Sequence, residues 1–382
     1  MTITGQIDTN TDEQVKEISK IWINALAEFG TKNSSEDLIS NKEFLEKAKE
    51  NIKKNRSSII GLWETFTVER DDLSKALLSK KEAAFAYLAG FHLGNVARTL
   101  ATIKRADERH PDLADKTKGK HIHIFDIACG TGASSIALAK SFKRNFTRSF
   151  TFYLTDASAS LLDIATHQIA DLSPASKIIS QRKMIEDIQI ENFAPQNGLN
   201  IYSLGYIWNE LKNNQKAKQK LEKIFQLIAK SDQPCLIQIS EPANEQQARG
   251  AMELRNNLCD TGLEVLYPCS HLNLCPLLES GRDWCYSEFS WERPYLQKFV
   301  DTMMDVKRTN LGSSSFLFAN KALDVKAGTP ETKVIVGKPK ISKDKDLGIQ
   351  LILCGEEGTS KSPAIKGKTS ILKGEIYNPR SK

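Results

Sequence analysis

Between residues 121 and 242 the sequence alternates short apolar runs with longer amphipathic segments, and this alternation constrains the fold more than any other feature. The expected strands lie at 121–128, 149–156 and 234–242, and 198–211 holds another strand with its following loop. The expected helices lie at 133–142, 158–169 and 215–230. Strands that are separated by helices usually run parallel, because each helix carries the chain back to the starting edge of the sheet. The alternation therefore predicts an α/β domain whose parallel sheet is covered by helices on both faces.

The flanking sequence has a different character. Residues 12–110 keep apolar side chains at steps of three and four, which predicts helices. After Pro242 we recognise no regular alternation until two β-runs within 332–358, joined by a charged turn. We therefore expect a helical region at 1–115, the α/β domain at 116–265, a cysteine-containing β region at 266–358 and a basic tail at 359–382.

A glycine-containing turn follows the first expected strand, in FDIACGTGASS. Gly130 and Gly132 lie where strand passes into helix, and glycine there lets the backbone approach a ligand closely. A dinucleotide site would have a third glycine where this chain has Ser135, and no Lys follows the turn as in a P-loop. Asp126 precedes the turn, which suits S-adenosylmethionine, a cationic ligand without phosphates.

Two further carboxylates extend this predicted cofactor site. Asp156 ends the second expected strand, where a carboxylate accepts hydrogen bonds from both ribose hydroxyls of a nucleoside. Asp187 follows an expected third strand and is a candidate near the adenine. Together these features predict a Rossmann-like methyltransferase sheet that binds S-adenosylmethionine. The alternative is a Rossmann-like domain with an empty pocket or one for another nucleotide.

The sequence names no catalytic residue. The loop after the fourth expected strand, SLGYIWNEL, has neither the D/N-P-P-Y/F pattern of amino-methylating enzymes nor the Pro-Cys pair of cytosine-5 enzymes. Asn209 and Glu210 lie there and could orient a substrate. They are equally well explained as a helix cap and a solvated acid.

Three of the seven cysteines, Cys269, Cys275 and Cys285, occur in one short polar segment. With His271 they form a plausible Cys3His zinc set. Alternatively, Cys354 from the later β region completes four thiolates around an iron–sulfur cubane, which tolerates irregular ligand spacing. The remaining cysteines have structural explanations: Cys129 lies in the glycine turn, Cys235 in a core strand and Cys259 on a helix.

The cysteine elements PCSHLNLCPL and RDWCYS follow FDIACGTGASSIAL, LIQISEPANEQQAR and the helical AAFAYLAGFHLGNVARTLATI. Over roughly Lys81 to Gly358 this combination resembles the mitochondrial small-ribosomal-subunit methyltransferase-like family, which also has bacterial members. The resemblance implies that Cys269, Cys275, Cys285 and Cys354 hold a [4Fe–4S] cluster. It further implies binding to small-subunit ribosomal RNA during assembly. The chain departs from the family in a longer gap before Cys285 and in Tyr286, where His is common.

Charge and hydropathy add a partner and a location. Residues 296–382 hold 16 Lys/Arg against 9 Asp/Glu, which indicates an anionic partner such as RNA or a merely solubilising surface. No apolar run is long enough to span a bilayer, and the first residues resemble neither a signal nor a transit peptide. We expect a cytoplasmic, bacterial protein without a membrane partner; its oligomeric state is not predicted.

The resulting hypothesis is a methyltransferase-like protein with a [4Fe–4S] site that acts on ribosomal RNA or in assembly of the small subunit. Its rivals are a non-catalytic assembly factor and a zinc-stabilised methyltransferase that acts on a small molecule or a protein.

Overall fold

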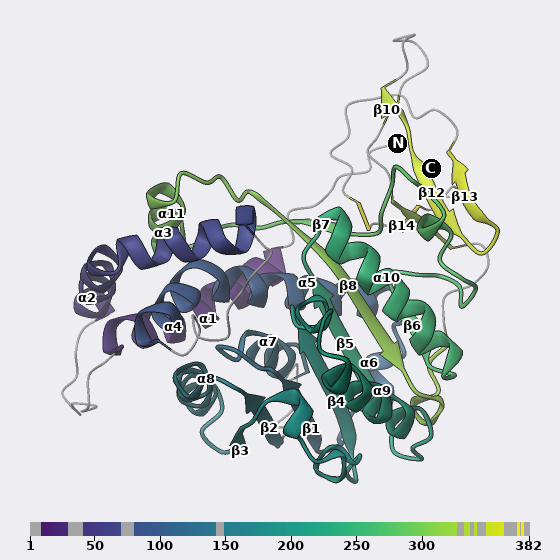
Figure 1. Ribbon diagram of the computed structural model, residues 1–382, viewed down its shortest axis with the longest axis horizontal. Coiled ribbons are helices and arrows are strands. Elements are labelled where there is room, and N and C mark those ends of the chain that lie inside the picture. The colour runs from purple at the N-terminus through teal and green to yellow at the C-terminus, as the bar shows by residue number, and fades with distance from the viewer. Residues whose placement is uncertain are drawn as a thin grey trace.

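A computed structural model describes residues 9–29, 41–69, 80–142, 149–326, 332–336, 340–341, 349–362, 373–374 and 376–377. Its centre is one large sheet with the strand order β3-β2-β1-β4-β5-β8-β6, and β7 pairs with β8 (Figure 1). The strands are β1 (Ile122–Ile127), β2 (Phe150–Asp156), β3 (Lys177–Arg182), β4 (Leu199–Gly205), β5 (Cys235–Glu241), β6 (Glu264–Tyr267), β7 (Ser287–Ser290) and β8 (Asn310–Ala319).

Strands β1 to β5 are parallel, and β8 is inserted antiparallel between β5 and β6. This confirms the predicted α/β class with a Rossmann-like methyltransferase sheet. The structure differs from the expectation after Pro242, because β6 and β8 continue the same sheet beyond residue 265. Their pairing partners are distant in sequence, and so local alternation could not reveal them.

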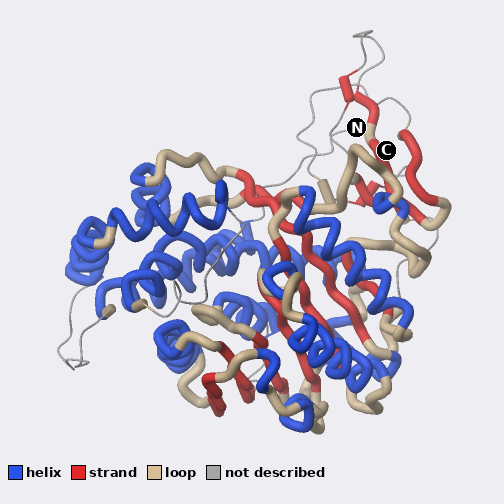
Figure 2. The backbone as a smooth tube through the Cα atoms, viewed as in Figure 1, coloured by secondary structure: helices blue, strands red, loops and turns tan. Residues whose placement is uncertain are grey.

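Helices cover both faces of the sheet, as the tube in Figure 2 shows. The α-helices are α1 (Thr9–Glu28), α2 (Asn41–Lys54), α3 (Arg56–Glu64), α4 (Lys81–Tyr87), α5 (Leu93–Arg109), α6 (Leu113–Thr117), α7 (Ala133–Phe142), α8 (Ala159–Leu172), α9 (Gln215–Ala229), α10 (Glu245–Asp260) and α11 (Tyr295–Met303). The π-helical turns η1 (Thr65–Glu69) and η2 (Leu88–His92) continue α3 and α4.

Alternate residues of each strand supply two cores. In β1, Ile122 and Ile124 pack with the N-terminal helices, α7 and α8, whereas Phe125 and Ile127 pack with α9 and α10. Side chains of a strand point alternately to opposite faces, and so a strand with both faces covered carries apolar side chains on both of them. No helix of the described segments is long and apolar enough to cross a membrane.

A small antiparallel sheet lies beside the large one, at the upper right of Figure 1. Its order is β13-β12-β9-β14, with β9 (Lys333–Ile335), β12 (Ile352–Gly355), β13 (Gly358–Lys361) and β14 (Ile376–Tyr377). A short ribbon of β10 (Lys340–Ile341) and β11 (Ile349–Gln350) accompanies it. The described parts of the expected basic tail thus include strands of this sheet, and most other tail residues lie outside the described segments.

Candidate functional site

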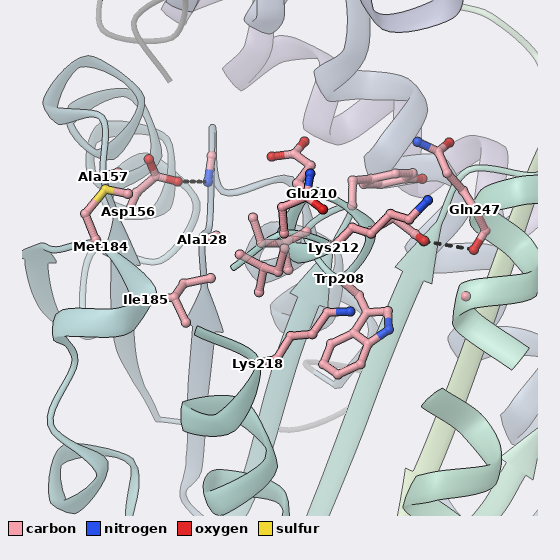
Figure 3. A pocket seen from close by; sticks show the side chains of 18 of the residues that line it. Ala128, Asp156, Ala157, Met184, Ile185, Trp208, Glu210, Lys212, Lys218 and Gln247 are labelled. Carbon is pink, nitrogen blue, oxygen red and sulfur yellow. Dashed lines mark hydrogen bonds between the residues drawn. The ribbon is translucent and has the colours of Figure 1, made fainter. Parts of the chain in front are cut away.

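A cavity of about 900 Å³ opens at the carboxyl ends of the parallel strands (Figure 3). Ligand sites of α/β sheets occur at this edge, and the volume is typical of a small-molecule pocket. Of the predicted cofactor residues, Gly130 and Asp156 line the cavity. The described lining residues do not include Asp126, Gly132 or Asp187.

The turn after β1 has an unusual backbone. Ala128, Gly130 and Gly132 have φ of 58°, 54° and 76°, and a non-glycine residue in this region is strained. The Gly130 N–H donates a hydrogen bond of 2.8 Å to Oδ2 of Asp156. A Cβ on Gly132 would lie 3.0 Å from Cβ of Ala165 in α8. Gly132 therefore permits close packing against α8, whereas Gly130 faces the cavity.

Asp126 lies behind this turn and is 1% exposed. Its Oδ2 accepts hydrogen bonds from N (3.2 Å) and Oγ (2.7 Å) of Ser135, at the start of α7. Burial raises the pKa of Asp126 to about 6, although the hydrogen bonds from Ser135 oppose the shift. In this structure Asp126 fixes the helix that follows the turn.

Asp156 ends β2 at the cavity wall. Its two oxygens accept from the backbone N–H groups of Gly130 and Ser158, both at 2.8 Å. Burial raises the pKa of Asp156, and these hydrogen bonds oppose the shift. Asp187 is exposed in the turn η3 (Ile185–Asp187), and its neighbours Ile185 and Glu186 line the cavity instead.

The segment after β4 is held by a brace that sequence reasoning missed. Glu241, at the end of β5, accepts from the Trp208 backbone N–H (2.8 Å) and from Nδ2 of Asn209 (2.9 Å). The same amide donates to the Gln247 carbonyl at 2.8 Å. A Cβ on Gly250 would overlap the Asn209 side-chain oxygen. Asn209 is thus held by Glu241, Gln247 and Gly250. In the sequence, the only indication of this arrangement was the Glu-Pro pair at the end of the expected strand 234–242.

This brace presents Glu210 to the cavity (Figure 3). The side chain is accessible from the cavity, but the surrounding protein replaces much of its water. Desolvation first, and then the charges of Glu241 and Asp156, raise the pKa of Glu210 to about 8. Burial likewise raises the pKa of Glu241 to about 7. The cavity therefore has an acidic wall with a carboxyl that titrates near neutral pH.

Basic side chains line other parts of the cavity. They are Arg182, Lys183, Lys212, Lys218 and Arg249. Arg249 pairs with Glu245, whereas within the described segments none of the other four forms an ion pair with a carboxylate. The Lys218 ammonium lies 5.1 Å from the ring centroid of Trp208. These four cations are available to an anionic ligand, whereas the acidic wall suits a cationic one.

The second site lies between α10, the loop from Cys269 to Cys285, and β12. Cys275 and Cys285 are each 7% exposed and belong to the core on the α9–α10 face, against which Cys269 and Cys354 also pack. Burial raises the pKa of the Cys285 thiol, and charges on the other three thiols raise it further. The fold thus brings Cys354 to the three loop cysteines; Cys235 is buried in β5 and Cys259 lies on α10.

Several buried polar atoms around these thiols have no hydrogen-bond partner among the described residues. They are Oγ of Ser270, Nδ1 of His271, Nε of Arg255, and Nε and Nη2 of Arg109. The other ring nitrogen of His271 lies 3.8 Å from Sγ of Cys354. In the part of the chain that is described, no group of three His, Cys, Asp or Glu side chains is arranged to hold a single metal ion.

The comparisons with known proteins give a family. A family model described as mitochondrial small ribosomal subunit Rsm22 matches residues 81–380. No curated protein is significantly similar to the chain in sequence.

Solved structures with similar folds include a putative RNA methyltransferase from Pyrococcus horikoshii at 12% identity, with 70% of this chain and 96% of that chain covered and a TM-score of 0.32. An rRNA methylase from Streptococcus thermophilus is 14% identical, with 59% and 97% covered and a TM-score of 0.28. The plantazolicin methyltransferase in complex with SAH is 15% identical, with 71% and 98% covered and a TM-score of 0.29. Similarity at this level indicates neither a substrate nor a reaction.

Proposed function

Because the chain belongs to the family of the mitochondrial small ribosomal subunit protein Rsm22, we propose that it is an S-adenosylmethionine-dependent methyltransferase that acts on RNA of the small ribosomal subunit and carries a [4Fe–4S] cluster. The observation that carries the methyltransferase part is the cavity at the strand ends, which is bounded by Gly130, Asp156 and Glu210. The proposed location is the cytoplasm of a bacterial cell, where small subunits are assembled.

The cavity residues fit S-adenosylmethionine. Gly130 has no side chain and so leaves room for a ligand at the cavity wall. A Cβ there would lie 3.7 Å from the ring of Tyr87, another lining residue. Asp156 would accept the ribose hydroxyls from the end of β2. The acidic wall would attract the cationic methionine end. Once bound, this cofactor supplies an electrophilic methyl group.

Glu210 is the proposed proton acceptor. A nucleophile that carries a proton must lose it as the methyl group is added, and the best base has a pKa near the working pH. The pKa of Glu210, about 8 because of desolvation, meets that condition. The brace from Glu241 and Asn209 keeps the carboxyl at the cavity, which limits the entropy lost when substrate binds.

The basic lining residues support an RNA substrate. Arg182, Lys183, Lys212 and Lys218 would contact phosphates, while a base enters the cavity toward the acidic wall. The Trp208 ring, with Lys218 near its face, offers a surface on which a base can stack. This arrangement adds a phosphate contact site to the one expected in the basic region 296–382, part of which lies outside the described residues.

The cysteine site fits an anionic cluster. Cys269, Cys275, Cys285 and Cys354 supply four thiolates, and the unpartnered donors of Arg255, Ser270 and His271 lie around them. Sulfur atoms of such a cluster accept hydrogen bonds, and these tune its potential. A cubane also separates its ligands more widely than one zinc ion does. The contact of His271 with Cys354 is the observation that favours the zinc alternative.

Protein purified without oxygen tests the proposal. We expect about four iron atoms per chain, a visible absorption band, and transfer of labelled methyl groups to small-subunit RNA. Glu210→Gln should reduce transfer at least about 100-fold, by much more than it weakens cofactor binding. Glu253→Gln, at another lining residue, should leave transfer unchanged. Zinc in place of iron would establish the zinc alternative, and cofactor binding without transfer to RNA or subunits would establish a non-catalytic assembly factor.

A further inference from the structure

Arg255 is a charged side chain enclosed in the core. It lies on α10, is 1% exposed and is among the largest fully buried side chains. Among the described residues no carboxylate forms an ion pair with it. An unpaired buried charge costs several kcal/mol, and so the groups around this guanidinium have to offset that cost.

The cysteine site lies beside Arg255. The guanidinium contacts the loop between Cys269 and Cys275, and so it lies near the thiols that would ligate the cluster. A buried cation at this position attracts the negative charge of a thiolate-ligated cluster.

Arg255 also holds the backbone that carries two of these thiols. Its Nη2 donates to the His271 carbonyl and its Nη1 to the Asn273 carbonyl, both between Cys269 and Cys275. Nη1 lies 3.0 Å from Oδ1 of the neighbouring Asn256, which accepts the Cys275 N–H at 3.0 Å as well. Two consecutive residues of α10 thus fix this loop.

A second arginine holds the start of the same loop. Nη1 of Arg109, on α5, donates to the carbonyls of Pro268 (2.6 Å) and Cys269 (2.9 Å). Arg109 thus contacts the residues before the loop's centre, and Arg255 contacts the centre itself. Arg255 differs in that it also contacts the side chain of Asn256, which accepts the N–H of Cys275 itself.

We infer that Arg255 is a positioning residue of the cysteine site: it offsets the negative charge of the thiolate-ligated cluster and fixes the loop from Cys269 to Cys275. This inference rests on the proposed cluster. Four thiolates give a [4Fe–4S]²⁺ core a net negative charge, and reduction adds another. A buried cation beside the site therefore stabilises the reduced form more than the oxidised form and raises the reduction potential.

The charge and the loop contacts can be separated by substitution. Arg255→Met removes both, and the reduction potential should become more negative. Arg255→Lys keeps the charge but cannot reach both carbonyls, so the potential should stay near that of the native protein. In both variants a chelator should remove iron about 10 to 100 times faster, as for other residues that support metal ligands. Arg282→Met is the control, because Arg282 is exposed in the loop between Cys275 and Cys285.

The measurements are iron content, the rate of iron loss and a spectroscopic redox titration of the full chain. Cys354→Ser and Cys259→Ser calibrate them, since the first should lose iron and the second keep it. If native protein binds no iron, the proposed cluster fails and the inference with it. If iron is bound but Arg255→Met keeps the native potential and iron-loss rate, the inference alone is wrong. If Arg255→Met does not fold, Arg255→Lys is compared with Arg282→Met instead. Equal rates of iron loss in these two variants would overturn the proposed role of the loop contacts. A shifted reduction potential in Arg255→Lys would overturn the proposed role of the charge.

Discussion

Gly374 lies where the C-terminal segment contacts the large sheet. Its substitution by alanine tests how strongly this contact holds the segment in place. Gly374 has φ of 85°, and a Cβ there would lie 2.6 Å from Cβ of Ser287 in β7. Real Cβ atoms do not approach this closely, and so the segment would have to move away. This segment contacts β7 at Ser287, two residues from Cys285. Its strand β14 pairs with β9, and β9 pairs in turn with β12, the strand that carries Cys354.

The magnitude follows from what this movement breaks. The Gly374 N–H donates to the Ile335 carbonyl at 2.8 Å, and the Glu288 N–H donates to the Lys373 carbonyl at 3.0 Å. The Lys373 ammonium lies 3.9 Å from the centroid of the Tyr286 ring. With the left-handed backbone added, the losses come to roughly 3–6 kcal/mol of local stability. That is enough to detach the segment at equilibrium without unfolding the parallel sheet.

Gly262→Ala is the matched control. Gly262 has a similar φ of 93°, but no atom of the described residues lies within 4 Å of a Cβ built there. It therefore carries only the backbone strain, about 1–2 kcal/mol. Hydrogen exchange at the Glu288 amide and limited proteolysis report the docking, and chemical denaturation reports global stability. Equal effects of the two variants, with the Glu288 amide still protected in Gly374→Ala, would refute the argument.

Two further predictions concern the cavity. Asp156→Ala should weaken S-adenosylmethionine binding by roughly ten- to a hundredfold, as measured by calorimetry. Asp187→Ala, at an exposed position, should leave the binding unchanged. Equal losses of affinity in the two variants would contradict the placement of Asp156 at the cofactor site. Because burial raises the pKa of Glu241 from 4.5 in the unfolded chain to about 7, the folded protein keeps a proton that the unfolded chain has released. The free energy of unfolding should therefore fall by about 3 kcal/mol as pH rises from 4.5 to 7, and denaturation of Glu241→Gln should lack this component.

The features that sequence predicted are those encoded locally. The strands β1, β2, β4 and β5 carry apolar side chains on both faces because both faces of the sheet are covered, and their carboxyl ends must meet at one edge. The placement of Gly130 and Asp156 at the cavity follows from that geometry alone. The assignment of Cys269, Cys275, Cys285 and Cys354 as metal ligands came from their grouping in the sequence together with a resemblance, and it stays a prediction.

The features that sequence did not predict depend on long-range packing. Strand β8 enters the sheet between β5 and β6, and nothing in its own residues specifies those neighbours. Arg255 lies in an ordinary amphipathic helix, where a cation is normally solvated; it is buried only because the loop after β6 covers it. Gly250 likewise looks like a weak helix position until Asn209 packs against it. In each case the partner is far away in the chain.

Helix α10 is common to both sites. In its first half, Gln247 and Gly250 hold Asn209 and thereby the turn that presents Glu210. In its second half, Arg255 and Asn256 hold the cysteine loop. Gly250 and Arg255 are only about 7.5 Å apart along the helix axis, and so a shift of the helix moves both sets of contacts.

The shared helix determines how experiments at either site have to be interpreted. Loss of the cysteine site releases the loop that covers Arg255, and the freed helix end can then displace Asn209 at the other end. A fall in methyl transfer after Cys354→Ser would therefore not place a cluster in the reaction. The deciding measurement is the pH dependence of the transfer that remains. If the Cys354→Ser protein keeps the titration of Glu210 near pH 8, the cysteine site supports the cavity through α10 and takes no part in the chemistry.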